Sequence, residues 1–495
     1  MSFFLSQAAP ATTPHPPLQF GPVAPELVLV GTAIALLLLD ALVTLRDQRP
    51  LVLLSLAGIA GAAASSIALW SWHGPATVLG NMVAADRFAV FLRLVVLGVA
   101  ALGVLLSYHY LDRAGEARGE YYPLLLFCTA GMTLIVSAAD LILIFLALEI
   151  LSLSLYLMTG FSFRRLASAE ASMKYFLLGA FSSAFFLYGI ALVYGATGTT
   201  NLAAISGRLS GQASVALALG AAGLLTTGFG FKVAAVPFHM WTPDAYQGAP
   251  TCVTAFMSAA TKVAAFGAFL RVFNVALHPL ARDWTPFVWV IAAITTIVGS
   301  LLAIAQTDVK RMLAYSSIAH AGFILVGVTA ASQNGIQGAM FYLVAYAAMI
   351  IGAFGVVILV SVRGEENLAL GSYAGLMRRS PLLAVALTLF LLSLAGIPGT
   401  AGFIAKVAVF SAATQAGHWP LVLIAVIASV VAAFFYIRVI ALMYMQEPQQ
   451  PPSTPIERAP IARLAVAIPA VLTVLFGVLP ALIFGFLRSA SVVRF

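Results

Sequence analysis

Long apolar segments follow one another along the whole chain, and they constrain the fold more than any other feature. A helix that crosses the ~30 Å hydrocarbon core of a bilayer needs about 20 apolar residues. The segments are continuous rather than alternating, so they indicate membrane-spanning helices and not the strands of a barrel. We therefore predict an all-α polytopic membrane protein with about 14 transmembrane helices. The segments lie at 24–45, 51–72, 86–110, 122–138, 140–161, 172–196, 213–236, 252–277, 285–306, 312–331, 336–361, 382–414, 421–445 and 461–487.

The composition excludes soluble classes of protein. Only 8% of the 495 residues are charged, whereas a soluble domain has roughly 25%. The net charge of +8 does not indicate a nucleic-acid partner, because the basic residues are scattered over short loops. The sequence has no Cys-x-x-Cys pair, Gly-Lys dipeptide or His-Glu-x-x-His motif. We therefore expect no iron–sulfur cluster, zinc site or phosphate-binding loop in this chain.

The distribution of basic residues predicts how the chain is oriented. Loops after odd-numbered helices contain 13 Lys or Arg residues, against 5 in the other loops and the two tails. Basic loops face the cytoplasm, so both termini are expected on the outer side. The first residues are proline-rich and contain no Lys or Arg, which favours a short lead over a secretory signal.

Ionisable residues inside the apolar segments are the candidates for function, because a charge at the centre of a membrane helix costs about 2.5–3.5 kcal/mol. A carboxylate, Glu149, follows eight apolar residues. Of the five lysines, only Lys310 is expected in a loop. A buried lysine can exchange its proton near neutral pH, which suggests proton transfer. The four lysines inside apolar segments are Lys174, Lys232, Lys262 and Lys406.

Three arginines also lie within predicted spans, namely Arg93, Arg271 and Arg438. An arginine stays charged, so it cannot carry a proton in the same way. For these residues, snorkelling toward the membrane surface or a fixed ion pair is the better explanation.

Two of the lysines lie beside residues that interrupt helices. Lys232 stands five residues before Pro237, and Lys406 follows the segment Gly396-Ile-Pro398-Gly. Interrupted membrane helices persist where they line protein or water, and they are typical of secondary transporters. The alternative, a kinked helix that only packs, does not explain a lysine at both interruptions.

The two interrupted segments share Lys-Val-Ala and stand five helices apart. A repeat of five helices has odd length, so its second copy enters the membrane upside down. We therefore predict two inverted repeats, at 122–277 for helices 4–8 and at 285–445 for helices 9–13. The rest of the chain divides into a lead at 1–23, helices 1–3 at 24–121, and a loop with helix 14 at 446–495.

Several motifs resemble the antiporter-like membrane subunits of respiratory complex I, over roughly residues 85–445. The stretch Trp-Thr-Pro-Asp-Ala-Tyr-Gln-Gly-Ala-Pro, which ends at Pro250, is highly specific. Subunits of multisubunit cation/proton antiporters share the fold and the Glu–Lys pattern. The other motifs are Phe145-Leu-Ala-Leu-Glu149-Ile-Leu-Ser-Leu-Ser-Leu-Tyr, Glu170-Ala-Ser-Met-Lys174-Tyr, Lys310-Arg311-Met-Leu-Ala-Tyr-Ser-Ser-Ile-Ala-His320 and Leu394-Ala-Gly-Ile-Pro398-Gly-Thr-Ala-Gly-Phe-Ile-Ala-Lys406.

The resemblance implies a proton-translocating membrane subunit of NADH-quinone oxidoreductase. It implies that Glu149 and Lys232 form a coupling pair, that Lys262 relays the proton, and that Lys406 carries it on the exit side. The resemblance also implies that Lys174 takes part in proton translocation and that His239 and His320 are candidate relays. These roles come from matching positions in the family motifs.

The same resemblance implies that this chain binds no cofactor, and that NADH, FMN, iron–sulfur clusters and quinone are handled by partner subunits. The expected partners are antiporter-like subunit M, small membrane subunits and, through them, the peripheral redox arm. The expected location is the bacterial inner membrane.

A comparison with the sister subunits M and L narrows the type of antiporter-like subunit that this chain resembles. In subunit M a glutamate stands at the position of Lys406, and subunit L carries a long lateral helix after its last span. This chain has a lysine at that position and ends soon after its last apolar segment. Neither subunit M nor subunit L matches it, so we expect the third antiporter-like type of subunit. Two rival functions stay open: a component of an independent cation/proton antiporter, and a structural spacer that would leave the intramembrane lysines unexplained.

Overall fold

The computed structural model describes residues 19–43, 47–211, 214–361, 366, 368–447 and 459–493. Most of the expected N-terminal lead at 1–23, and part of the loop expected after residue 445, lie outside the described residues.

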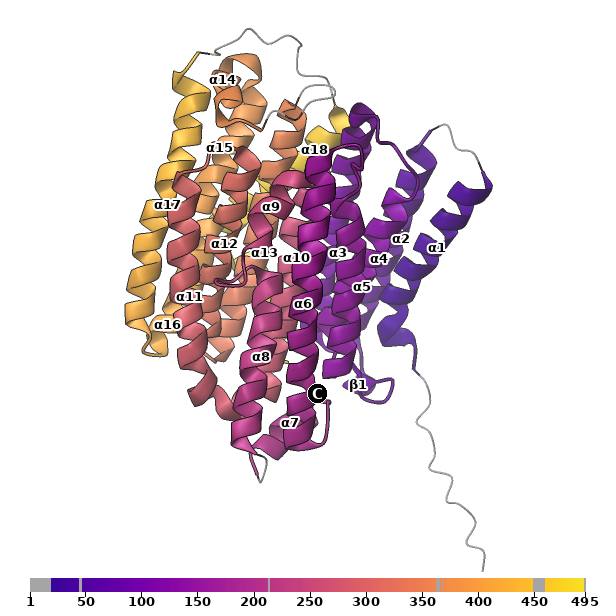
Figure 1. Ribbon diagram of the computed structural model, residues 1–495, viewed down its shortest axis with the longest axis vertical. Coiled ribbons are helices and arrows are strands. Elements are labelled where there is room, and N and C mark those ends of the chain that lie inside the picture. The colour runs from indigo at the N-terminus through magenta and orange to yellow at the C-terminus, as the bar shows by residue number, and fades with distance from the viewer. Residues whose placement is uncertain are drawn as a thin grey trace, which may run out of the picture.

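Helices make up almost all of the described chain, and most of them run along one common direction (Figure 1). One short hairpin of β1 (Thr77–Val78) and β2 (Val83–Ala84) lies between α2 and α3. The helices are α1 (Ala24–Leu42), α2 (Arg49–Ala68), α3 (Arg87–Ala114), α4 (Tyr121–Ser137), α5 (Leu141–Thr159), α6 (Leu166–Thr197), α7 (Leu202–Leu209), α8 (Val215–Val233), α9 (Trp241–Gly248), α10 (Thr251–Arg271), α11 (Ala281–Ile304), α12 (Val309–Val328), α13 (Gln333–Val360), α14 (Leu376–Arg379), α15 (Pro381–Ala395), α16 (Ala401–Gln415), α17 (Trp419–Met445), α18 (Pro460–Val478) and α19 (Ala481–Ala490).

The apolar segments expected from the sequence all form helices. Twelve helices in the described ranges are long and apolar enough to cross a membrane. The segment expected at 122–138 is the 17-residue α4, and the segment at 382–414 is divided into α15 and α16. The β-hairpin and α7 lie at the end where the C-terminus lies, and α14 lies at the opposite end (Figure 1). The chain is therefore an all-α, polytopic membrane protein.

Local capping chemistry sets where the helices begin and end. The carboxylates of Asp86, Asp140 and Asp308 accept hydrogen bonds from the first-turn amides of α3, α5 and α12, whose N–H groups have no partner within the helix. At the other end, α3 stops at Gly115 and α6 at Gly198, both with φ of 66°. Glycine adopts this left-handed conformation without a Cβ clash.

Two short non-helical segments lie close to the predicted helix breakers, while broken membrane helices at spans 7 and 12 stay a prediction. Helix α8 ends at Val233, and α9 begins only at Trp241; α15 ends at Ala395, and α16 begins at Ala401. In both cases the first helix is followed by a residue with positive φ, Ala234 at 63° and Gly396 at 88°. The inverted relation of the two five-helix repeats stays a prediction, as do the domain boundaries.

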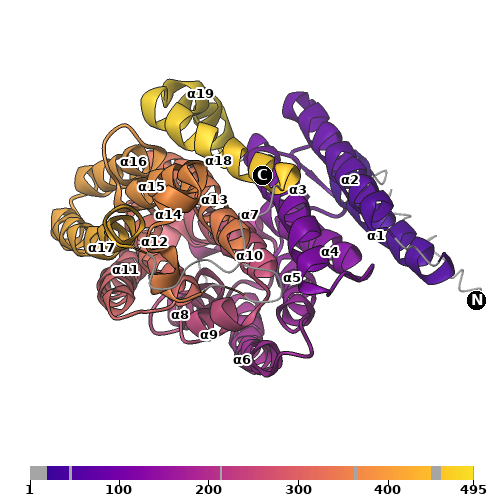
Figure 2. The same ribbon diagram turned by 90° about the horizontal axis from the view of Figure 1, so that it is seen from above.

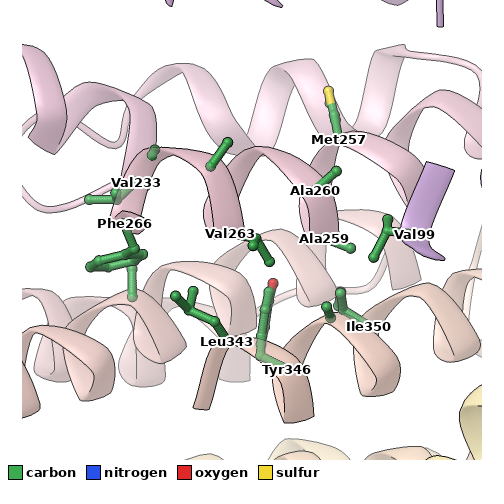
Figure 3. Packing of buried hydrophobic residues seen from close by; sticks show 14 of the residues in the cluster. Val99, Val233, Met257, Ala259, Ala260, Val263, Phe266, Leu343, Tyr346 and Ile350 are labelled. Carbon is green, nitrogen blue, oxygen red and sulfur yellow. The ribbon is translucent and has the colours of Figure 1, made fainter. Parts of the chain in front are cut away.

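The core of the molecule lies around α10 and α13. Over the apolar stretch that is long enough to cross a membrane, every residue of α10 is buried, and almost every residue of α13. Val263 and Phe266 of α10 face Leu343 and Tyr346 of α13 (Figure 3). The surrounding helices α6, α11 and α17 leave many large apolar side chains exposed, which fits contact with lipid. This arrangement places Lys262, on α10, at the centre of the molecule.

Candidate functional site

Lys232 and Glu149 lie on helices α8 and α5, both of which pack against α6. Lys232, on α8, is 3% exposed, and its Nζ has no hydrogen-bond acceptor in the described part of the chain. The Glu149 carboxylate, on α5, is half-buried and accepts a hydrogen bond from the Ser183 hydroxyl of α6. The structure gives these two described residues no direct ion pair, although their charges interact electrostatically. Their role as a coupling pair stays a prediction.

Aromatic rings surround the Lys232 ammonium. Its Nζ lies 5.4 Å from the ring centre of Tyr156 and 5.3 Å from that of Tyr175, within the range of cation–π attraction. Tyr175 stacks on Trp241 at 4.4 Å between ring centres. The Trp241 indole N–H donates to the Phe231 carbonyl at 2.8 Å, across the interruption between α8 and α9. This aromatic box holds a cation without fixing it by hydrogen bonds.

Lys262 lies between three helices at the centre of the molecule. Its side chain is almost fully buried, and Nζ donates to the Ser317 carbonyl of α12. The same Nζ lies 5.3 Å from the ring centre of Tyr346 on α13. Lys262 therefore contacts both α12 and α13, and its role as a relay stays a prediction.

His320, on α12, is the next buried polar residue of the candidate site. Its Nδ1 lies 2.8 Å from the Tyr342 hydroxyl of α13, and its Nε2 lies 3.3 Å from the Tyr436 hydroxyl of α17. The Tyr436 hydroxyl also shares a hydrogen bond with Ser316. The imidazole is thus part of a buried chain of groups that can both donate and accept hydrogen bonds.

Lys406, on α16, is held in a different way from Lys232. Its Nζ donates to the carbonyls of Leu394 at 3.1 Å and Ala395 at 2.7 Å, and to the Ser429 hydroxyl at 2.7 Å. The two carbonyls lie at the end of α15, where no following helical turn supplies donors. Lys406 therefore also caps the helix that the interruption leaves open.

The remaining two candidates, Lys174 and His239, are more exposed than Lys232, Lys262, His320 and Lys406. Lys174 is not buried like the other three intramembrane lysines: its side chain is 46% exposed and pairs with Glu170 at 2.7 Å and Asp244 at 3.0 Å. It lies in the third turn of α6, which begins six residues earlier than its apolar segment, and its role in translocation stays a prediction. His239 is half-buried in the turn between α8 and α9.

The three intramembrane arginines form fixed contacts. Arg271 binds the Asp86 carboxylate through two hydrogen bonds of 2.9 Å. Arg93 pairs with Glu26 at 2.9 Å, and both side chains are almost fully buried. Arg438 donates to two backbone carbonyls at the end of α11, at 2.9 and 2.6 Å. These contacts assign the arginines to helix packing.

The expectation that Lys310 lies in a loop is wrong, because it is the second residue of α12. Lys310 is completely buried at the start of α12, donates to the Ala249 carbonyl at 2.6 Å and pairs with Glu366 at 3.3 Å. The apolar segment begins two residues later, at 312, so the sequence pattern places Lys310 outside it although the helix includes it. No group of three or more His, Cys, Asp or Glu that could hold a metal occurs among the residues described.

Comparison with known proteins identifies the family. The model of the family "NADH:quinone oxidoreductase/Mrp antiporter, TM" matches residues 138–432, more than half of the chain. This chain belongs to that family. The matched range of the NADH:quinone oxidoreductase/Mrp antiporter family runs from before Glu149 to beyond Lys406 and so includes every candidate site residue.

Relatives and solved structures of the NADH:quinone oxidoreductase/Mrp antiporter family match nearly the whole chain. NADH-quinone oxidoreductase subunit N of Trichlorobacter lovleyi is 45% identical over 470 residues, 94% of this chain and 96% of the relative. A chain of respiratory complex I from Thermus thermophilus is 36% identical with a TM-score of 0.78, covering 93% of this chain and 98% of its own. A chain of the Mrp complex from Dietzia is 23% identical with a TM-score of 0.82, over 95% and 97%; at that identity it shows the fold alone.

Proposed function

We propose that this chain is the subunit N-type, proton-translocating membrane subunit of a bacterial NADH-quinone oxidoreductase. The observation that carries the proposal is the 45% identity to a relative named subunit N, over 94% of this chain. The presence of Lys406, where the sister subunit M has glutamate, supports the same type. In this proposal, partner subunits hold NADH, FMN, the iron–sulfur clusters and quinone.

The proton path runs from Lys232 through Lys262 and His320 to Lys406. Because the Lys232 ammonium has no hydrogen-bond acceptor among the described residues, its charge depends on the aromatic rings and on the field of Glu149. An opposite charge nearby favours the charged form of a lysine. A change at Glu149, driven by electron transfer in the partner subunits, therefore alters how firmly Lys232 holds its proton.

Helix α12 connects the later groups of the path. It contacts Lys262 through the Ser317 carbonyl, it carries His320, and the ring of Phe323 lies 5.0 Å from the Lys406 Nζ. Water between these polar groups completes the transfer. The path follows the sequence order of the helices from the first interrupted segment to the second.

Substituting Glu149 with glutamine tests the proposal. Glutamine is nearly isosteric, so packing holds while the charge disappears. We expect the Glu149→Gln complex to assemble, with reduced proton pumping in vesicles and reduced coupled NADH oxidation. Glu149→Asp keeps the charge with a shorter reach and should be milder. Wild-type pumping by a fully assembled Glu149→Gln complex would remove Glu149 from the mechanism.

We further propose that the protein resides in the bacterial inner membrane with both termini on the outer side. Its partners are subunit M, small membrane subunits and, through them, the redox arm. Purification in mild detergent tests this: NADH dehydrogenase subunits should co-purify with the chain. In addition, NADH oxidation should be absent from the chain when it is purified without them.

A subunit of a multisubunit cation/proton antiporter is the second candidate, because the same family model includes Mrp antiporters. The two functions differ in their driving force. Vesicles that contain the purified assembly should acidify on addition of NADH and quinone if the first is correct. Cation-driven proton movement without any redox substrate would favour the second.

A further inference from the structure

An apolar groove runs along α3 on the side away from α4. It has a volume of about 910 Å³ and is formed by α3, α13, α18, α19 and the short helix Leu69–Ser71. Its lining on α3 extends from Phe91 to Leu105, a rise of roughly 21 Å at 1.5 Å per residue. Figure 2 shows α18 and α19 lying beside α13 and α3. The groove is therefore long and follows the membrane-crossing direction.

One end of the groove carries a positive charge and aromatic rings. Trp70 and Phe486 both line it, with ring centres 6.0 Å apart. The Arg87 guanidinium lies 5.6 Å from the Trp70 ring centre, and its Nε donates to the Trp70 carbonyl at 3.2 Å. Arg87 is exposed and stands one turn before Phe91. Aromatic and basic side chains of this kind lie at the level of lipid headgroups.

The shape and charge together indicate the occupant. The lining is apolar over its length of roughly 21 Å on α3, and Arg87 lies beside Trp70 at one end of it. Acyl chains suit the apolar lining, and a phosphate suits the guanidinium at its end. We propose that the groove binds the acyl chains of an anionic phospholipid of the surrounding bilayer, with its phosphate at Arg87.

A lipid in this groove would pack against the face of α13 that is opposite the proposed proton path. The groove is lined by Val344, Ala347 and Ile351 of α13. Tyr342 and Tyr346 of the same helix contact His320 and Lys262 on the other side. The binding proposal itself does not depend on the proposed function, and its test needs no pumping assay.

Filling the groove with a side chain tests the proposal. A Cβ built on Gly98, which lines the groove, meets no atom within 4 Å, so Gly98→Phe can enter the groove without a backbone clash. Gly31 on α1 has the same open surroundings outside the groove, and Gly31→Phe is the matched control. The probe is phosphatidylglycerol with a photoreactive group on its acyl chain, added to the purified complex.

We expect cross-links in segments 91–105, 344–351 and 468–476 of the wild-type chain. Their yield should fall at least fivefold in Gly98→Phe and stay unchanged in Gly31→Phe. Arg87→Gln should bring the preference for phosphatidylglycerol over phosphatidylcholine close to one, whereas Arg87→Lys should keep it. The Arg87 variants decide the question if Gly98→Phe does not assemble.

Equal cross-linking in wild type and Gly98→Phe would overturn the proposal. An unchanged headgroup preference in Arg87→Gln would overturn the assignment of the phosphate to Arg87. A segment of a partner subunit seated in the groove of the assembled complex would replace the lipid as its occupant.

Discussion

At the scale of single residues, Lys232 and Lys406 differ in how their ammonium groups are held. Lys232 is surrounded by rings and has no acceptor within the described chain, whereas Lys406 donates to two carbonyls and one hydroxyl. The shared Lys-Val-Ala pattern predicts equal behaviour at the two positions. The contacts instead suggest that Lys406 combines proton transfer with helix capping, while Lys232 has no capping role.

Alanine and arginine variants separate the two roles. Lys406→Ala should lower thermal stability, since it removes the ammonium donor of the Leu394 carbonyl, at about 1–3 kcal/mol for a buried group left unpaired, and leaves the Ala395 carbonyl with only the Ser429 hydroxyl at 3.4 Å. Lys232→Ala should not. Arginine keeps the charge but does not release its proton, so Lys232→Arg and Lys406→Arg should both assemble and both impair pumping. Thermal unfolding in detergent and proton translocation in vesicles, normalised to assembled complex, are the measurements. Full pumping by either arginine variant would make that lysine an anchor rather than a carrier.

The sequence identifies the charged members of the site because a charge in an apolar segment is rare and costly. It does not identify Tyr156, Tyr175 or Trp241 around Lys232. Aromatic residues are common in membrane helices, and nothing in their spacing shows which ones face a lysine of another helix. Tyr436 is missed for the same reason, since it reaches His320 from a helix more than one hundred residues away.

At the scale of the helices, two buried ion pairs connect α3 to its neighbours. Asp86, at the N-cap of α3, pairs with Arg271 at the end of α10, and Arg93 of α3 pairs with Glu26 of α1. Removing one partner of a buried pair is expected to cost about 3–5 kcal/mol, because the other charge stays in a low-dielectric environment.

Arg271→Met should therefore lower the thermal stability of the chain strongly. The matched control is Arg378→Met, which removes an ion pair with Glu447 whose side chains are 71% and 77% exposed; such surface pairs contribute about 0–1 kcal/mol. Thermal unfolding of both variants in the same detergent gives the comparison. Equal stability loss would show that burial does not decide the contribution of these pairs. The double variant Asp86→Leu with Arg271→Met should recover part of the loss.

The long helices could be predicted because each needs about 20 apolar residues to cross a bilayer. Pro237 and Gly396 lie in the non-helical segments that separate α8 from α9 and α15 from α16. Helix α7 and the β1–β2 hairpin could not be predicted in this way, since no apolar period marks them. They are held by polar contacts between loops, such as the Asn201 amide with the Asn81 carbonyl at 2.9 Å.

At the scale of the whole molecule, Glu366 joins elements from both predicted repeats. Its carboxylate accepts hydrogen bonds from Tyr110 of α3 and from the Thr251 hydroxyl of α10, both at 2.6 Å. It also pairs with Arg165, between α5 and α6, at 3.1 Å and with Lys310 of α12 at 3.3 Å. One carboxylate outside the membrane spans thus connects four parts of the chain.

This network predicts how stability depends on pH. Burial alone would raise the pKa of Glu366, but Lys310, Arg165 and the two hydroxyl donors outweigh it and lower the pKa to about 2. A carboxyl whose pKa is lower in the folded chain than its ordinary value of 4.5 stabilises the fold above that ordinary value. This stabilisation, about 3 kcal/mol at 1.36 kcal/mol for each pKa unit, is lost as the pH falls from about 4.5 toward 2.

Glu366→Gln should therefore lower the melting temperature at neutral pH and reduce its dependence on pH below about 4.5. Glutamine cannot be ionised, so the variant has no such stabilisation to lose on acidification. The exposed Glu447→Gln variant is the control and should follow the wild-type curve. Thermal unfolding in detergent from pH 7 to pH 3 measures all three proteins. If wild type and Glu366→Gln lost stability equally on acidification, Glu366 would not be the group that connects the two halves through its charge.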